Sequence, residues 1–416
     1  MSDFFKIEYK DGLKRVGKII TDNGVLETPN FIPVATLGSI KALDSVSVLN
    51  LGIQAIFCNT YHLHLQPGED VIYHLGGLHK FINYKGVIFT DSGGFQAFSL
   101  GQALIDKVGK IANIFPNSSK KNIDLLSNRL SKLSNNKEKL ALMNENGIVF
   151  KSHLDGKIFK LTPENSIEIQ LKLGSDILLT LDECTSPLAS YEYTKESTFR
   201  SFYWTERSFK YFVQNKDNYK EYRRFLYGIV QGGYYYDLRK WSLEKILSLN
   251  FDGYAIGGSL GRSKEDLYEI LNWLSFPDNK PRHLLGIGTI NEIFIAIEHG
   301  IDTFDCIIPT RYARTGTVFV KYEDNYKNNF TLDITASIYK GKDTKKYDLP
   351  IDENCNCYTC RNYSVAYLNH LFNANEISAM TLLTIHNLYF YNELLKKIRL
   401  SIINKSYERF KKDFFN

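Results

Sequence analysis

Eight short apolar runs, six of which end in a polar residue or a glycine, constrain the fold of this 416-residue chain most strongly. They occupy residues 31–35, 55–59, 87–91, 176–182, 226–231, 253–258, 283–288 and 303–308. Such lengths and such continuous apolar character are typical of strands buried on both faces of a parallel sheet. Helical patterns separate most of the runs, for example at residues 163–173 and 290–299, the second followed by Gly300 at a C′ position. The sequence therefore predicts an α/β fold, the (β/α)8 TIM barrel.

Polar residues and glycines lie where these strands are expected to end, which is where barrels of this kind carry their active sites. The residues at these positions are Asn59, Asp91, Asp182, Gln231 and Gly258, with Asp305 close by. An acid, an amide and backbone N–H groups around one pocket can read the edge of a purine. After Asp91, two glycines allow close approach of the backbone to a ligand, and Phe95 offers a flat face for stacking. Each residue alone is compatible with a structural role, so the prediction depends on their convergence.

The eighth run carries one acid, Asp305, and Arg311 and Arg314 follow it. A carboxylate beside paired guanidinium groups suits covalent work on a phosphate-bearing substrate. A strand-end aspartate held in a salt bridge is the simpler interpretation of Asp305 taken alone. If Asp91 lies across the barrel mouth, it supplies the second carboxylate that a double displacement needs.

Three of the six cysteines, Cys355, Cys357 and Cys360, lie close together, and His386 follows after a helical spacer. Three thiolates and an imidazole would complete a tetrahedral zinc site with no open position for substrate. The sequence therefore predicts one structural Zn²⁺ in an inserted zinc-binding subdomain near the C-terminus. His370 is the competing imidazole. This spacing favours reduced thiols over a disulfide framework.

The net charge and the distribution of apolar and charged residues indicate the partners, the compartment and the domain organisation of the chain. A net charge of +5 is compatible with nucleic acid without demonstrating it. No apolar run is long enough to span a membrane, and the N-terminus is too polar for a signal peptide, so we expect a soluble, cytoplasmic protein. A Lys/Asn-rich insertion at about 102–146 is either a solvated excursion or a patch that attracts nucleic acid, and a hairpin is expected at 147–161. The predicted domains are a catalytic barrel at 1–320, a zinc-binding subdomain at 321–390 and a C-terminal helical segment at 391–416.

Taken in order, these motifs closely resemble those of the bacterial tRNA-guanine transglycosylases, also called queuine tRNA-ribosyltransferases. The matching segments include NTYHL at 59–63, DSGGFQ at 91–96, FKSHLDG at 150–156, LDECT at 181–185, GIVQGG at 228–233, FDGYAIGG at 251–258, GIDTFDCIIPTR at 300–311, the cysteine box and TIHN at 384–387. The resemblance implies exchange of the wobble guanine of tRNAs with GUN anticodons for a 7-deazaguanine, the pre-queuosine base 7-aminomethyl-7-deazaguanine, in queuosine biosynthesis. It also implies a homodimer that binds the tRNA anticodon loop.

The resemblance implies a role for each matching residue. Asp305 would be the nucleophile that forms a covalent ester with the ribose, and Asp91 the general acid/base. The base and its ribose would contact Ser92, Phe95, Gln96, Asp182, Cys184, Gln231, Gly257, Gly258 and Leu285. The RNA would contact Asn59, Arg311 and Arg314, and zinc would bind Cys355, Cys357, Cys360 and His386.

Other functions were weighed against this one. A non-catalytic RNA-binding partner subunit is disfavoured because both Asp91 and Asp305 are present. An archaeosine-type enzyme is disfavoured because the chain ends soon after the zinc-binding region, and a zinc hydrolase because the metal site is filled. The segment after Gly258 is one residue shorter than in the family, which leaves open whether the small precursor base or the bulkier queuine is used.

Overall fold

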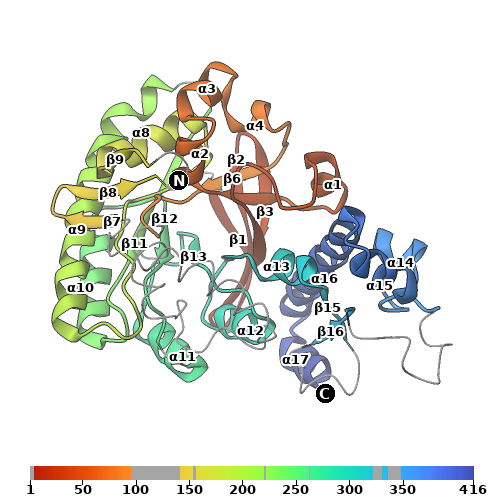
Figure 1. The fold of residues 1–416 in the computed structure, drawn as a ribbon. Coiled ribbons are helices and arrows are strands. Elements are labelled where there is room, and N and C mark those ends of the chain that lie inside the picture. The colour runs from red at the N-terminus through yellow and green to blue at the C-terminus, as the bar shows by residue number, and fades with distance from the viewer. Residues whose placement is uncertain are drawn as a thin grey trace. The chain divides into compact units, whose positions relative to one another are not determined.

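The computed structural model describes residues 4–95, 141–152, 156–219, 222–261, 263–321, 330–335 and 348–416. Gln96 and most of the predicted insertion lie outside these residues. Eight parallel strands close into a barrel in the order β10-β11-β12-β13-β14-β4-β5-β6, so the predicted (β/α)8 fold is confirmed (Figure 1). The barrel strands are β4 (Asn30–Ala35), β5 (Ala55–Cys58), β6 (Val87–Thr90), β10 (Ile177–Leu179), β11 (Phe225–Val230), β12 (Gly253–Ile256), β13 (Arg282–Leu284) and β14 (Thr303–Cys306).

Every barrel strand falls within or beside one of the eight apolar runs of the sequence. Strands β5, β6, β11, β12 and β14 are buried at every position. Continuous burial explains why these strands show unbroken apolar runs instead of an alternating pattern.

The helices vary in length from the 5 residues of α4 to the 27 residues of α16. In the first half of the chain they are α1 (Ser45–Asn50), α2 (Thr60–Leu65), α3 (Glu69–His74), α4 (Gly77–Phe81), α8 (Pro163–Leu173) and α9 (Tyr191–Asn215), with a 3₁₀ turn at Lys216–Asn218. In the second half they are α10 (Tyr236–Leu247), α11 (Lys264–Trp273), α12 (Ile290–Glu298), α13 (Ile308–Arg314), α14 (Tyr358–Asn362), α15 (Val365–Asn373), α16 (Ile377–Ile403) and α17 (Tyr407–Phe415). No helix in the described residues has the length and apolar content that a membrane span requires.

Two of these helices have the ends that the sequence predicts. Thr162 caps the start of α8 through its hydroxyl, and Gly174 follows its end in the left-handed conformation with a φ of 74°. Helix α12 starts with a capping box between Thr289 and Glu292, and Gly300 lies beyond its end with a φ of 75°. Local side chains therefore set these boundaries, which is why sequence alone could find them.

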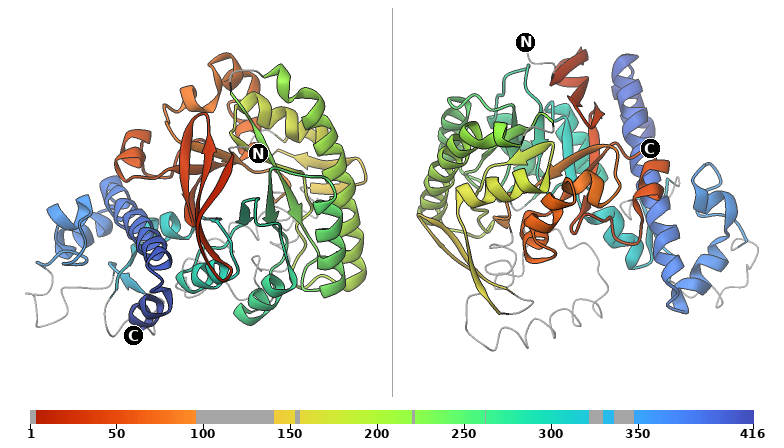
Figure 2. Two further views of the ribbon diagram at one scale, coloured as in Figure 1. Left: turned by 180° about the vertical axis from the view of Figure 1, so that it is seen from behind. Right: turned by 90° about the horizontal axis from the view of Figure 1, so that it is seen from above.

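Residue contacts divide the chain into two compact units. The first unit consists of Met1–Cys58, Ile82–Ile88 and Gly286–Asn416, and the second of Asn59–Phe81 and Phe89–Leu285. In the second unit, α9 packs against α8 and α10 (Figure 2), and the predicted hairpin is confirmed within an antiparallel sheet of β7 (Ala141–Asn144), β8 (Gly147–Lys151) and β9 (Ile158–Leu161). The division into domains at residues 320 and 390 stays a prediction.

The first unit contains an antiparallel sheet that the sequence analysis did not identify. Its strands are β1 (Phe5–Asp11), β2 (Lys14–Thr21) and β3 (Gly24–Thr28), and a two-stranded sheet of β15 (Thr317–Phe319) and β16 (Thr331–Asp333) follows α13. The long helix α16 packs against α13, α15 and the strands β1, β2 and β4. This helix is therefore the main packing element of the first unit.

A buried ion pair joins the sheet to the barrel within the first unit. The side chains of Arg15 on β2 and Asp302 before β14 are 1% and 0% exposed, and the Arg15 Nε donates to Asp302 Oδ1 at 2.9 Å. A second contact joins Arg15 Nη2 to Asp302 Oδ2. Removing one partner of such a pair leaves a buried charge uncompensated.

We expect Arg15→Met to lower the free energy of unfolding by about 3–5 kcal/mol, because the Asp302 carboxylate is then left alone in the core. Urea unfolding followed by circular dichroism measures the change. Lys18→Met on the same strand is the matched control, because Lys18 pairs with Glu8 at 2.8 Å on the exposed face and its loss should leave the midpoint nearly unchanged. Equal midpoints for the two variants would contradict the assignment.

Candidate active site and metal cluster

The predicted site residues of the second unit follow the ends of barrel strands. Asp91 directly follows β6 and Gln231 directly follows β11, while Asn59 and Leu285 directly follow β5 and β13. Asp182 lies three residues after β10 and Gly258 two residues after β12. The sequence therefore identified the strand ends correctly.

The half-buried carboxylate of Asp91 is held by the residues that follow β5. The Asn59 side-chain amide donates to Asp91 Oδ2 at 2.5 Å, and the backbone N–H of Thr60 donates to Oδ1 at 2.8 Å. The Thr60 hydroxyl donates to the Asp91 backbone carbonyl at 2.5 Å. The Asn59 side-chain oxygen also accepts from the His62 N–H at 3.0 Å, capping α2. Thr60, which the sequence analysis did not single out, thus helps to orient one of the two candidate catalytic acids.

Asp182 is the centre of a second group of side chains, which comes from three strand ends. Ser92 donates from its hydroxyl to Asp182 Oδ1 at 3.1 Å, and the Gln231 Nε2 donates to Oδ2 at 2.5 Å. The side chains of Ser92, Asp182 and Gln231 are 2%, 7% and 2% exposed. We call Ser92, Asp182, Gln231, Gly257 and Gly258 the strand-end cluster. Its members were predicted to bind the same ligand, and the structure brings them together.

Glycines are required in the strand-end cluster because side chains crowd the backbone. A Cβ on Gly258 would lie 2.1 Å from Gln231 Oε1, and the residue has a φ of +75°. A Cβ on Gly257 would lie 3.0 Å from Gln231 Nε2 and 3.4 Å from Asp182 Oδ2. The backbone at these glycines therefore lies against the amide and the carboxylate without an intervening side chain.

A buried arginine supports the same loops. The side chain of Arg239 on α10 is 0% exposed, and its guanidinium donates to four backbone carbonyl oxygens. These belong to Gly233 at 2.8 Å, Val230 at 3.0 Å, Gly257 at 3.0 Å and Ser259 at 2.7 Å. Burial lowers the pKa of Arg239 to about 9, and Cys184 opposes this shift, so the group is a cation at neutral pH. The sequence analysis did not single out Arg239.

The other predicted base-binding residues differ in exposure. Phe95 is 36% exposed, whereas Leu285 is 9% and Cys184 is 5% exposed. The Cys184 thiol donates to the Thr185 carbonyl at 3.8 Å. An exposed aromatic ring and a buried aliphatic side chain are compatible with the predicted stacking on a planar base.

The candidate nucleophile lies in the first unit. Asp305 is 8% exposed, and its Oδ1 accepts from the backbone N–H of Gly286 at 2.9 Å. Burial raises the pKa of the neighbouring Cys306 thiol to about 12, so this cysteine stays protonated at neutral pH. A thiol that stays protonated is a poor nucleophile, so Cys306 is not a candidate for this role.

The two predicted phosphate-binding arginines lie on α13. Arg311 is exposed, and the half-buried Arg314 donates to the Thr310 carbonyl at 2.7 Å. Burial and the positive charge of Arg311 both lower the pKa of Arg314. An anion bound beside these guanidinium groups would relieve both effects, which suits a phosphate.

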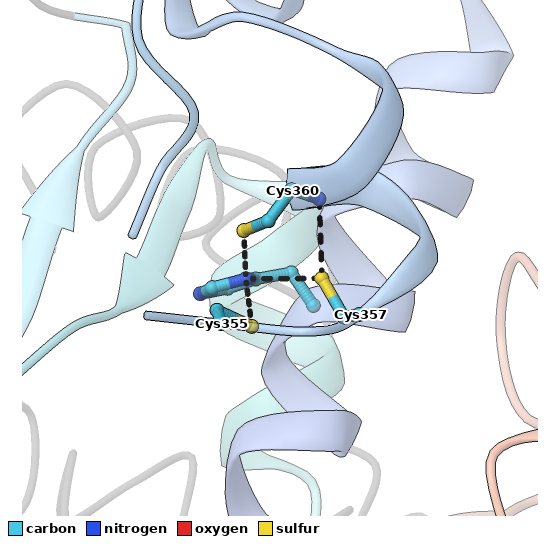
Figure 3. Close-up of side chains that lie close together, drawn as sticks. Cys355, Cys357 and Cys360 are labelled. Atoms are coloured by element: carbon cyan, nitrogen blue, oxygen red, sulfur yellow. Dashed lines mark hydrogen bonds between the residues drawn. The ribbon is translucent and has the colours of Figure 1, made fainter. Parts of the chain in front are cut away.

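The four predicted metal ligands form one cluster. The sulfur atoms of Cys355, Cys357 and Cys360 and a ring nitrogen of His386 all lie within 4.8 Å of one another. The three sulfurs are 3.8, 3.5 and 3.3 Å from His386 Nδ1 (Figure 3). Ligand atoms of tetrahedral zinc are about 3.5–3.8 Å apart, so the donor set and its spacing fit zinc. His370 is exposed on α15 and is not part of the cluster.

Helix α16 connects this cluster to the segment that carries Asp305 and the arginines. The His386 Nε2 donates to the Phe319 carbonyl at 2.7 Å, which leaves Nδ1 facing the thiols. The next residue, Asn387, donates to the carbonyls of Pro309 and Thr317 at 3.0 Å each, and accepts from the Phe319 N–H at 2.9 Å. Asn387 thus binds the backbone of the first turn of α13 and of β15.

Together, these features define a (β/α)8 barrel enzyme with acids at its strand ends and a cysteine–histidine metal cluster near its C-terminus. A family model described as queuine tRNA-ribosyltransferase matches residues 11–123 and 102–416. The chain belongs to this family, whose members are tRNA-guanine transglycosylases and thus pentosyl-transferring enzymes.

Several relatives match over almost the whole chain. A protein of Archaeoglobus fulgidus is 44% identical over 99% of this chain and 98% of its own length. The queuine tRNA-ribosyltransferase of Thermodesulfovibrio yellowstonii is 41% identical over 99% of this chain and 94% of its own. That of Fusobacterium nucleatum is 40% identical over 99% of this chain and 96% of its own.

We expect Gly258→Ala to raise the KM for guanine in base exchange by about tenfold, because the added methyl group would push Gln231 away from Asp182. Steady-state exchange of labelled guanine into tRNA measures it. Gly156→Ala is the matched control: Gly156 has a φ of +72° but nothing within 4 Å of its Cβ position. A KM that rises equally in both variants would show that backbone strain, and not the contact with Gln231, limits position 258.

Proposed function

We propose that this chain exchanges the wobble guanine of tRNAs with GUN anticodons for 7-aminomethyl-7-deazaguanine, by a retaining double displacement through a covalent Asp305–ribose ester. The observation that carries the proposal is that Asp91 and the strand-end cluster follow barrel strands of the second unit, while Asp305 lies near the end of β14 in the first. Barrel enzymes carry their catalytic groups at the carboxyl ends of the strands. The full-length match to the queuine tRNA-ribosyltransferase family supports the same reaction.

Asp305 attacks the ribose C1′ in the first displacement. A bond forms between the carboxylate oxygen and C1′ as the bond from C1′ to guanine N9 breaks, and Asp91 gives a proton to the departing base. In the second displacement the incoming base loses a proton to Asp91 and attacks C1′, which releases the Asp305 carboxylate. Both acids end as they began, and two inversions at one carbon retain its configuration. The hydrogen bonds from Asn59 and Thr60 hold Asp91 for these transfers.

The strand-end cluster reads the base in this proposal. A 6-oxopurine offers N–H and amino donors along one edge and a carbonyl oxygen beside them, so Asp182 accepts from the donors while Gln231 and the N–H of Gly258 serve the carbonyl. Ser92 and Gln231 already orient the Asp182 carboxylate. Cys184 lines the same pocket, and Phe95 and Leu285 stack on the two faces of the base. Gln96 lies outside the described residues and keeps its proposed role on sequence grounds.

The tRNA contacts belong to the proposal as well. Arg311 and Arg314 bind backbone phosphates of the anticodon loop, and Asn59 faces the same substrate while it orients Asp91. The target guanine has to be presented unstacked, which a loop of single-stranded RNA allows. The enzyme acts in the cytoplasm as a homodimer in this proposal, as part of queuosine biosynthesis.

The Cys355, Cys357, Cys360 and His386 cluster holds one structural zinc ion. Four protein ligands complete a tetrahedral shell, so the metal stabilises the fold around α14 and α16 and does not activate water. Buried apolar residues of the first unit surround the cluster, among them Leu368, Leu382 and Leu383. The metal would therefore stabilise an apolar core to which Cys357 and Cys360 themselves belong.

We expect Asp305→Asn to lower the rate of guanine exchange by about a thousandfold or more, because the amide cannot form the ester with ribose. Exchange of labelled guanine into tRNA measures the rate, and denaturing electrophoresis detects the covalent RNA adduct. Asp333→Asn, an exposed acid on β16, is the control and should keep both. Substantial exchange by Asp305→Asn, or an adduct on this variant, would reject Asp305 as the nucleophile.

We expect purified protein to contain about one zinc per chain, and Cys357→Ser to lose the metal together with thermal stability. Elemental analysis and a melting curve measure the two effects. Cys58→Ser is the matched control, because Cys58 is also buried but lies on β5 outside the cluster; it should keep its zinc. Folded wild-type protein without metal would refute the assignment.

A further inference from the structure

The Arg239 side chain is fully buried and makes more hydrogen bonds than packing against its neighbours would require. It is 0% exposed, and it comes from α10 to meet the backbone after two barrel strands, β11 and β12. Burying a guanidinium is costly unless its donors are satisfied. Four carbonyl oxygens of these two strand ends accept from it at 2.7–3.0 Å. A guanidinium has five N–H donors in a planar fork and can bind four fixed oxygens at once, whereas an ammonium group has only three N–H donors.

The two carbonyls on the β12 side determine how the neighbouring peptides are oriented. Arg239 binds the oxygens of Gly257 and Ser259, the residues on either side of Gly258. In a trans peptide the C=O and the following N–H point in opposite directions. With the Gly257 oxygen held by the guanidinium, the N–H of Gly258 points away from Arg239. Because Gly258 has a φ of +75° and no side chain, this peptide would otherwise rotate more easily than most.

The side of the loop away from Arg239 is the strand-end cluster. Cβ positions built on Gly257 and Gly258 lie within 3.4 Å of the Gln231 amide or the Asp182 carboxylate. Helix α10 also holds the β11 end, since the Ser242 hydroxyl accepts from the Gln231 N–H at 3.0 Å and the Val230 carbonyl binds Arg239. One helix therefore sets the position of both strand ends that face Asp182.

We propose that Arg239 is a positioning residue that fixes the Gly257–Gly258 peptide with its N–H toward the bound base, and thereby gives the pocket its preference for purines with a 6-oxo group. A fixed N–H donor forms a hydrogen bond with the 6-oxo oxygen of a base. On a base without this oxygen, the donor finds no acceptor. Leaving such a donor unpaired in a buried site costs free energy, and this cost weakens the binding of bases that lack a 6-oxo group. This inference rests on the proposed function and adds to it the group that sets base selectivity.

The test compares guanine with 6-thioguanine, which keeps the ring, the N1–H and the amino group but carries sulfur, a weak hydrogen-bond acceptor, in place of the 6-oxygen. Affinities for the full-length protein without tRNA are measured by calorimetry for wild type, Arg239→Lys and the control Lys245→Met, an exposed residue of the same helix. Wild type and Lys245→Met should prefer guanine by about tenfold, the worth of one buried hydrogen bond. Arg239→Lys keeps the charge but cannot bind four carbonyls, so the ratio of the affinities for the two bases should fall toward one. The KM for tRNA in base exchange should stay unchanged. A purely structural disturbance of the pocket would lower the affinities for both bases by the same factor.

The outcomes separate the inference from the proposed function. Wild-type protein that binds neither base would overturn the proposed function. If wild type prefers guanine and Arg239→Lys prefers it by the same factor, the role of Arg239 is overturned and the proposed function is not affected. If Arg239→Lys does not fold, amide hydrogen exchange of ¹⁵N-glycine-labelled wild type decides: guanine should slow exchange at Gly258 more than 6-thioguanine does at matched saturation. Equal slowing would overturn the inference.

Discussion

The carboxylate of Asp182 is the interaction on which the recognition surface of this barrel depends. One oxygen accepts from Ser92 after β6 and the other from Gln231 after β11, so a single buried acid joins three strand ends. A buried carboxylate is stable only when its oxygens are hydrogen-bonded. The neighbouring residues of β12 are glycines, because the Gln231 amide occupies the space that a side chain at Gly258 would need. The glycines after β12, their backbone conformation and the negative charge of the site are therefore all linked to the buried Asp182 carboxylate.

The two candidate catalytic acids are held in different ways, which suits different roles. Asp91 is half-buried and receives hydrogen bonds from the Asn59 amide and the Thr60 backbone. Asp305 is 8% exposed and receives one from the Gly286 backbone. An acid that exchanges protons with a base needs access to it, whereas a nucleophile needs a fixed position in a site from which water is excluded.

Sequence reasoning found the features whose causes are local. The barrel strands could be predicted because burial on both faces leaves a continuous apolar run, and the end of α12 because Gly300 carries its own capping signal. The spacing of the three cysteines indicated a possible metal site, and the structure brings His386, not His370, to them. Arg239 could not be found in this way, because an arginine on a helix is expected at the surface and its carbonyl partners come from two other loops. The strands β1–β3 were also missed, since their exposed faces interrupt the apolar pattern.

Helix α16 carries His386 in the cysteine–histidine cluster and, one residue later, Asn387, which binds the carbonyls of Pro309 in α13 and Thr317 in β15. Adjacent residues of one helix cannot be displaced independently, so a metal that fixes His386 also fixes the carboxamide beside it. Thermodynamic linkage then makes the effect reciprocal. Under the proposed function, an RNA that orders the arginines of α13 would therefore strengthen metal retention by the same factor by which the metal would strengthen RNA binding.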